Sequence, residues 1–204
     1  MKIKKLIALL IAVVIVTSSV LSVSAATLTD VTVDNSTAVK ANIEDPGSVS
    51  YVITIPETVD FGTLTQPDSI DADHYAIYRF EVEATELNLK SNQGVTVYMK
   101  DANSTDNQFY LEQQNTETPF KISYDVYDTT VTVDNINTYD PINKTAEPGT
   151  YGYHLCTFLY DAQGRTQPVN LALNQNALYG QTISDIAGDY SGTITFHCSL
   201  FERS

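Results

Sequence analysis

Apolar and polar residues alternate along most of the chain beyond residue 48, which is the pattern of half-buried β-strands. In residues 120–126, phenylalanine, isoleucine, tyrosine and valine fill the even positions, whereas lysine, serine and aspartate fill the odd ones. Similar patterns predict the further strands 49–55, 77–83, 94–99, 108–111, 151–160 and 192–200. Helical periodicity is weak throughout, and only residues 172–183 suggest one short helix.

Turn-forming residues separate these predicted strands at regular intervals. Clusters of aspartate, asparagine, proline and glycine occur at residues 45–47, 101–107, 147–149, 161–164 and 187–189. Many short strands divided by such turns are typical of sandwiches. The sequence therefore predicts an all-β fold, an antiparallel β-sandwich of either the immunoglobulin-like or the jelly-roll-like type.

Similar short motifs recur about 100 residues apart. The sequence of residues 31–35 returns at 131–135, and five further pairs follow in the same order. Internal duplication is one interpretation, and chance similarity among threonine- and valine-rich strands is the other. No glycine-, serine- or proline-rich linker divides the chain, so we expect a single domain over 27–204. A split near residue 127 is the alternative.

The N-terminus carries the pattern of a secretory signal peptide. Three lysines within the first five residues precede an apolar run at 6–16, and small residues occupy 23–26. This pattern predicts a signal peptide over residues 1–26, cleaved after Ala25 or Ala26. No second apolar run reaches the roughly 18 residues that span a bilayer, so we expect no transmembrane anchor after cleavage. The mature chain is expected outside the cell, secreted or associated with the cell surface.

The expected mature chain is strongly acidic. Cleavage removes three of the 11 basic residues and none of the 25 acidic ones, which leaves a formal net charge of −17. Such a charge repels nucleic acids and anionic membranes, so neither is an expected partner.

The only two cysteines are Cys156 and Cys198, each on the inward side of a predicted strand. Export would place the cysteines in an oxidising environment, which favours a disulfide between them if their strands are neighbours. Two buried free thiols are the alternative. His154 and His197 each lie within two residues of one of these cysteines. Adjacent strand residues such as His197 and Cys198 point to opposite faces and cannot easily share one ion, so we predict no metal site there.

One acidic loop carries the spacing of a calcium site. Asp101, Asn103 and Asp106 offer alternating oxygen ligands, although the loop lacks the glycine and the distal glutamate of an EF-hand. A second acidic loop spans residues 68–73. Solvated turns are the alternative for both, because aspartate and asparagine bond to their own backbone.

The chain matches no catalytic motif that we recognise. It contains no G-x-S-x-G elbow, no H-E-x-x-H pair and no glycine-rich phosphate loop. We therefore expect no catalytic residues, no cofactor and no enzymatic activity. The 13 tyrosines allow a binding surface, but the absence of tryptophan disfavours a glycan platform.

Two segments resemble known secreted proteins. Residues 51–62 read YVITIPETVDFG and residues 188–196 read GDYSGTITF. The first resembles the opening strand of secreted surface proteins of Gram-positive bacteria. The second is similar to the closing strand of WxL-type surface proteins and fimbrial subunits. The tryptophan motif that names the WxL group is absent. The resemblance implies an extracellular sandwich used for adhesion or assembly.

The segment between the signal peptide and the first strong strand has a pattern of its own. Within residues 27–50, the apolar residues Val31, Val33, Val39, Ala41 and Ile43 all fall at odd positions. The segment is either the protein's own first strand or a strand donated to a neighbour's sheet.

Together these features predict an exported bacterial cell-surface or extracellular protein. It would act in structure or adhesion, by binding or self-assembly. Its expected partners are other surface proteins, copies of itself or extracellular glycans. The alternative is a secreted glycan- or ligand-binding module that depends on calcium.

Overall fold

The computed structural model describes residues 25–29, 49–102, 104–162 and 165–203. Most of the predicted signal peptide, and with it residues 1–24, lies outside these ranges. So do residues 30–48, which include all five apolar positions of the predicted N-terminal strand, and Asn103 of the predicted calcium loop.

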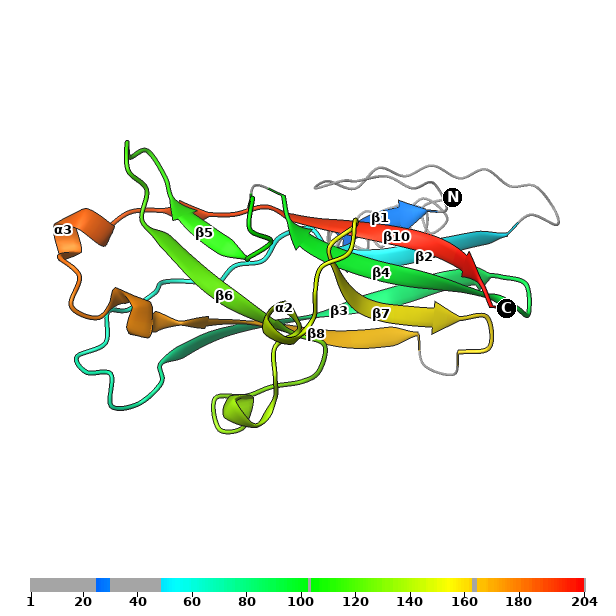
Figure 1. Cartoon of the computed structure of the whole chain (residues 1–204), viewed down its shortest axis with the longest axis horizontal. Helices are drawn as coiled ribbons and strands as arrows, with labels where there is room; N and C mark the ends of the chain where they lie inside the picture. Colours follow the sequence, from blue (N-terminus) through cyan, green and yellow to red (C-terminus); the bar gives the residue numbers. More distant parts are fainter. Residues whose placement is uncertain (1–24, 30–48, 103, 163–164, 204) are drawn as a thin grey trace, which may run out of the picture.

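The described chain forms two antiparallel sheets, which confirms the predicted all-β sandwich-like fold (Figure 1). The larger sheet contains, in spatial order, β1 (Ala25–Thr29), β2 (Ser50–Pro56), β3 (Tyr75–Asn88), β8 (Thr166–Asn174), β6 (Lys121–Tyr127), β5 (Tyr110–Gln113) and β9 (Tyr190–Ser191). The smaller sheet contains β10 (Ile194–Glu202), β4 (Gln93–Asp101) and β7 (Tyr153–Leu159) in that order.

Helices are few and short among the described residues: η1 (Ile136–Thr138), α2 (Ile142–Thr145), η2 (Gln175–Leu178) and α3 (Ile183–Ile186). The helix predicted over 172–183 is wrong at its start, because residues 166–174 form β8. Residues 169–173 are all buried, so this strand lacks the alternation that would have identified it. No helix within the described ranges is long and apolar enough to cross a bilayer.

The core lies between the facing sides of the two sheets. The alternation predicted for residues 120–126 is observed, since Ile122, Tyr124 and Val126 are buried whereas Lys121 and Ser123 are exposed. Aromatic rings join the two sheets across the core. The ring of Phe80 on β3 meets that of Phe196 on β10 edge-on, with centroids 6.1 Å apart.

Strands from both halves of the chain interleave within each sheet. In the larger sheet β8 pairs with β3 on one side and with β6 on the other, and in the smaller sheet β4 lies between β10 and β7. A domain boundary near residue 127 would therefore separate hydrogen-bonded neighbours.

Two of the six matched pairs differ in secondary structure. Residues 65–67 lie in a loop, whereas their supposed counterparts 166–168 begin β8. Residues 76–78 belong to β3, whereas 177–179 close the 3₁₀ helix η2. Chance similarity therefore explains these two pairs better.

A tight turn before β7 packs against the outer face of the smaller sheet. Gly149 and Gly152 exchange two backbone hydrogen bonds of 2.9 and 3.0 Å. The turn stacks the ring of Tyr151 on that of His197, with centroids 3.6 Å apart and planes within 6°. His197 is thereby shielded although it lies on the outward side of β10.

Candidate functional site

A groove of about 910 Å³ is lined in part by α3, which lies at one end of the long axis of the molecule (Figure 1). Residues 55–64, which leave β2, and residues 188–196, which form β9 and the start of β10, border it. The helix α3 and the strands β5 and β6 also contribute to its lining, as do Gln66 and Leu178. Parts of the segments 51–62 and 188–196 thus border the same groove.

The lining combines polar and apolar groups in similar amounts, and its apolar side chains come from both bordering segments. Val59, Phe61 and Leu64 contribute from the first segment, and Ile194 and Phe196 from the second. The ring of Phe61 contacts that of Tyr124 on β6, with centroids 5.6 Å apart. Burial, and to a smaller extent the Asp101 carboxylate, raises the pKa of Tyr124. Its hydroxyl therefore stays neutral, and this part of the groove carries no charge.

Pro56 ends β2, and the chain beyond it runs to residue 74 without a strand. Proline lacks the N–H that a strand ladder needs. Side chains then hold this wall in place: Gln66 Nε2 donates hydrogen bonds of 2.8 Å to the carbonyls of Leu178 and Gln181. Tyr78 donates a 3.3 Å hydrogen bond from its hydroxyl to the carbonyl of Thr58. Within the described ranges, residues 57–64 make no backbone–backbone hydrogen bond.

The opposite border presents the edge of a strand. Thr193 and Arg203 flank β10 and both have odd numbers. Thr193 O accepts a 2.8 Å hydrogen bond from Ala102 N, and Arg203 N donates a 2.6 Å hydrogen bond to Asn92 O. The backbone hydrogen bonds to β4 therefore fall on the odd-numbered residues of β10. The backbone N–H and C=O groups of Ile194, Phe196 and the other even residues therefore point away from β4. No described strand pairs with that side of β10. An edge of this kind is a template for an additional strand.

Charge at the groove has one sign. The charged residues along its lining are Glu57, Asp60 and Asp189, and no lysine or arginine of the described residues lines it. An occupant would therefore be apolar in the centre and neutral or basic at the margins.

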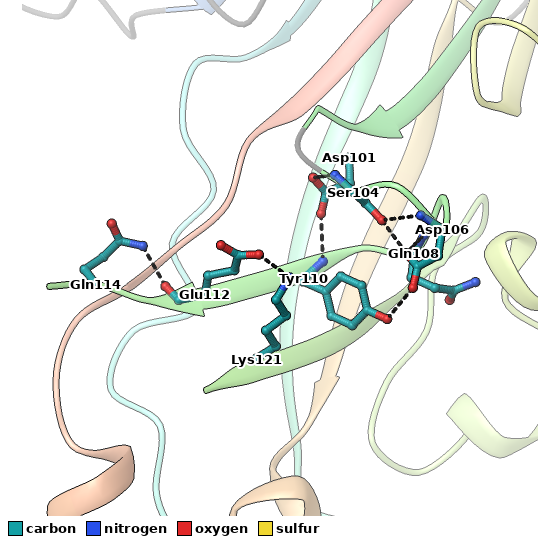
Figure 2. Close-up of polar contacts among 8 residues, drawn as sticks. All are labelled: Asp101, Ser104, Asp106, Gln108, Tyr110, Glu112, Gln114 and Lys121. Carbon is teal, nitrogen blue, oxygen red and sulfur yellow. Dashed lines mark hydrogen bonds and ion pairs between the residues drawn. The ribbon is translucent and has the colours of Figure 1, made fainter. Parts of the chain in front are cut away.

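The predicted calcium loop stabilises itself through its own polar groups (Figure 2). Asp101 accepts a 3.2 Å hydrogen bond from Ser104 N on Oδ1 and a 2.9 Å bond from Tyr110 N on Oδ2. Asp106 Oδ1 accepts from the Ser104 hydroxyl and from Gln108 N, the latter at 3.1 Å. Its Oδ2 accepts a 3.0 Å hydrogen bond from the Tyr110 hydroxyl.

These bonds use the carboxylate oxygens that a cation would need. The hydrogen bond from Ser104, followed by that from Gln108, lowers the pKa of Asp106. Nowhere in the described part of the chain do three His, Cys, Asp or Glu residues come together as metal ligands. In the second acidic loop, Asp73 accepts hydrogen bonds from Asn174 and Asn137. The calcium hypothesis therefore gains no support at Asp101 and Asp106.

The disulfide expected between Cys156 and Cys198 is absent, and both are buried free thiols. Cys198 on β10 and Cys156 on β7 are both paired with Val97, on opposite sides of β4. Two strand spacings place their Cα atoms about 10 Å apart, whereas a disulfide needs less than about 7 Å. The disulfide prediction was wrong because the two strands are not neighbours.

We expect both thiols to be inert in the folded protein. Burial raises the pKa of each to about 12, so the reactive thiolate is scarce at pH 8. A thiol reagent should leave the native mature chain unmodified at pH 8 and label both cysteines after unfolding in urea. Rapid labelling of the native protein, or a mobility change on reduction, would contradict this arrangement.

The sequence did not predict the groove. The apolar residues of the groove at 59, 61 and 64 keep neither the period of a strand nor that of a helix. This irregular spacing is the one feature of the sequence that could have indicated the groove. Comparison with protein-family models, curated proteins and solved structures found no match for this chain.

Proposed function

We propose that this protein is an exported structural or adhesion protein of the bacterial cell surface that works by binding an extended segment of another polypeptide. The segment adds a strand to the free side of β10 and buries its apolar side chains in the groove. The mode is strand addition, in which main-chain hydrogen bonds supply affinity and pockets for alternate side chains supply specificity.

One observation carries this proposal: the groove runs beside an edge of β10 with which no strand of the described residues pairs. On β10 the outward-pointing backbone groups belong to residues 194, 196 and 198, and Ile194 and Phe196 also line the groove. A strand placed there would gain hydrogen bonds and hydrophobic contacts together. Each apolar side chain that becomes fully buried would contribute about 1.5–3 kcal/mol.

Ile183 provides a test because it lines the groove while its side chain is exposed. It is 57% exposed on α3, so replacing it with aspartate should leave the fold intact. We expect Ile183→Asp to weaken binding of the partner segment about tenfold, through lost burial and added negative charge. Ile70→Asp is the matched control, since Ile70 is 58% exposed and lies outside the groove.

The measurement is the native mass of the mature protein by light scattering, as a function of concentration. A lower mass for Ile183→Asp than for Ile70→Asp and the wild type supports assembly through the groove. Equal mass curves for all three proteins would contradict it.

A small apolar ligand is the second candidate occupant. The groove volume of about 910 Å³ lies within the range of roughly 300–1,000 Å³ that is common for ligand pockets. Val59, Phe61 and Leu64 would contact the apolar part of such a molecule. Native mass spectrometry of protein from its producing cells would distinguish the two, because a retained ligand adds a small fixed mass to the monomer.

A further inference from the structure

We infer that a second pocket, separate from the groove, binds the guanidinium group of an arginine side chain on a partner polypeptide. This pocket, which we call the Tyr153 pocket, has a volume of about 400 Å³. Its lining comes from residues 106–108, from the end of α2 and the residues up to Pro148, and from Tyr153 on β7. No described residue lines both the Tyr153 pocket and the groove, so the inference goes beyond the proposed function and does not depend on it.

A buried tyrosine hydroxyl faces this pocket without a hydrogen-bond partner among the described residues. Only 2% of Tyr153 is exposed, and its ring packs on that of Phe109 in the core, with centroids 5.8 Å apart. Burial, followed by the carboxylates of Glu147 and Asp106, raises the pKa of Tyr153. The hydroxyl therefore stays neutral beside two acids. Buried polar groups normally have a partner, and a ligand in the pocket would supply one.

The first acid of the pocket, Asp106, is held in a fixed orientation by its own loop (Figure 2). Its Oδ1 accepts hydrogen bonds from the Ser104 hydroxyl and Gln108 N, whereas its Oδ2 accepts one from the Tyr110 hydroxyl at 3.0 Å. A carboxylate oxygen has two lone pairs. Within the described ranges, Oδ2 thus keeps one lone pair for a further donor.

The second acid, Glu147, follows a segment that is anchored to β6. Asn143 Oδ1 accepts a 3.0 Å hydrogen bond from Val126 N, and Lys144 Nζ forms a 2.6 Å ion pair with Asp125. Lys144 also lines the pocket, but Asp125 compensates its charge. Glu147 is exposed, and neither acid of the pocket forms a salt bridge in the described part of the chain. The pocket therefore offers two carboxylates to a cation.

These acceptors match a guanidinium group better than a metal ion or an ammonium group. A guanidinium carries its N–H donors around a planar fork, so it can bond to carboxylates and a hydroxyl oxygen that lie on separate segments. An ammonium concentrates its donors on one nitrogen. Calcium takes about six to eight oxygen ligands, and both lone pairs of Asp106 Oδ1 are already used. The two acids would repel the carboxylate of free arginine, so the ligand is an arginine within a polypeptide.

Chemical-shift mapping of the isotopically labelled mature protein tests this inference. The probe is N-acetyl-arginine amide at millimolar concentrations, and its citrulline counterpart, which has a similar shape without the charge, is the ligand control. We expect the arginine probe to shift the amides of Asp106, Gln108 and Glu147 saturably. The amide of Asp189, at the acidic margin of the groove, should not shift. The citrulline probe should shift none of them.

Two variants test the contacts of the pocket. Tyr153→Phe removes the hydroxyl and keeps the ring against Phe109, whereas Glu147→Gln removes one charge from an exposed side chain. We expect each to weaken binding of the arginine probe about tenfold, because each removes one acceptor for a charged donor. Glu117→Gln is the matched control, since Glu117 is exposed and lies outside the pocket, and it should leave binding unchanged.

Several outcomes would overturn the inference. These are the absence of saturable shifts, equal shifts with the citrulline probe, and unchanged binding in both Tyr153→Phe and Glu147→Gln. Displacement of the arginine probe by micromolar calcium chloride would identify a metal site instead. An equal response to N-acetyl-lysine amide would contradict the choice of a guanidinium group, and tighter binding of free arginine than of its amide would contradict the assignment to a polypeptide.

Discussion

Replacing Gly152 with alanine is expected to destabilise the protein by about 3 kcal/mol or more. Gly152 has a φ of +103°, a conformation that residues with a side chain rarely adopt. A Cβ atom at this position would also lie 2.5 Å from the carbonyl oxygen of Met99 and 2.7 Å from Cβ of Lys100. The backbone of β4 would have to shift to accept it, and the turn would lose the stacking of Tyr151 on His197.

Gly149 supplies the control for this variant. It belongs to the same turn, but a Cβ atom there would meet its nearest neighbour at 3.8 Å, and its φ is not in the left-handed region. Gly149→Ala should therefore change the free energy of unfolding by less than about 0.5 kcal/mol. Urea denaturation of both variants measures the difference, and equal midpoints would show that the turn tolerates a side chain at residue 152.

Replacing Phe109 with alanine is expected to cost about 3–5 kcal/mol of stability. Phe109 is fully buried, with 0% of its surface exposed. Its ring lies between those of Tyr124 on β6, at 5.6 Å, and Tyr153 on β7, at 5.8 Å. Because Tyr124 also contacts Phe61, a row of four aromatic rings runs from the groove to the smaller sheet. Phe109 is the third ring of this row, counted from the groove. Removing its side chain would therefore leave a cavity within the row.

Phe201→Ala is the comparison for Phe109→Ala. Phe201 is only partly buried, on the outer face of the smaller sheet, where its ring covers Gly94. It should therefore cost clearly less than Phe109→Ala, about 1–2 kcal/mol, since less apolar area returns to water. Thermal or urea unfolding measures both variants, and a larger loss for Phe201→Ala would contradict the central position of Phe109.

Local sequence patterns predicted the faces of individual strands well. The alternation in residues 120–126 identified which side of β6 faces the core, because one side of that strand is solvated. The same reasoning failed for β8, where consecutive residues are buried on both faces and no period remains. Periodicity can identify a strand only when one of its faces is exposed to solvent, and the buried residues 169–173 of β8 have no such face.

Strand order could not be predicted from the sequence. Cys156 and Cys198 both lie on core strands as expected, but β4 lies between those strands, and nothing local in the chain specifies that order. The groove was missed for the same reason. It arises where a strand-free segment after Pro56 meets β9 and β10, which are more than 120 residues later in the chain.

The most direct test of strand addition is hydrogen–deuterium exchange at the backbone amides of β10, in the assembled mature protein and in Ile183→Asp. We expect the amides of Ile194, Phe196 and Cys198 to exchange slowly in the assembled protein and rapidly in the variant. The amides of the odd residues, which bond to β4, should stay slow in both. Equal exchange of the even residues in the two proteins would show that no strand adds to this edge, and would contradict the proposed function.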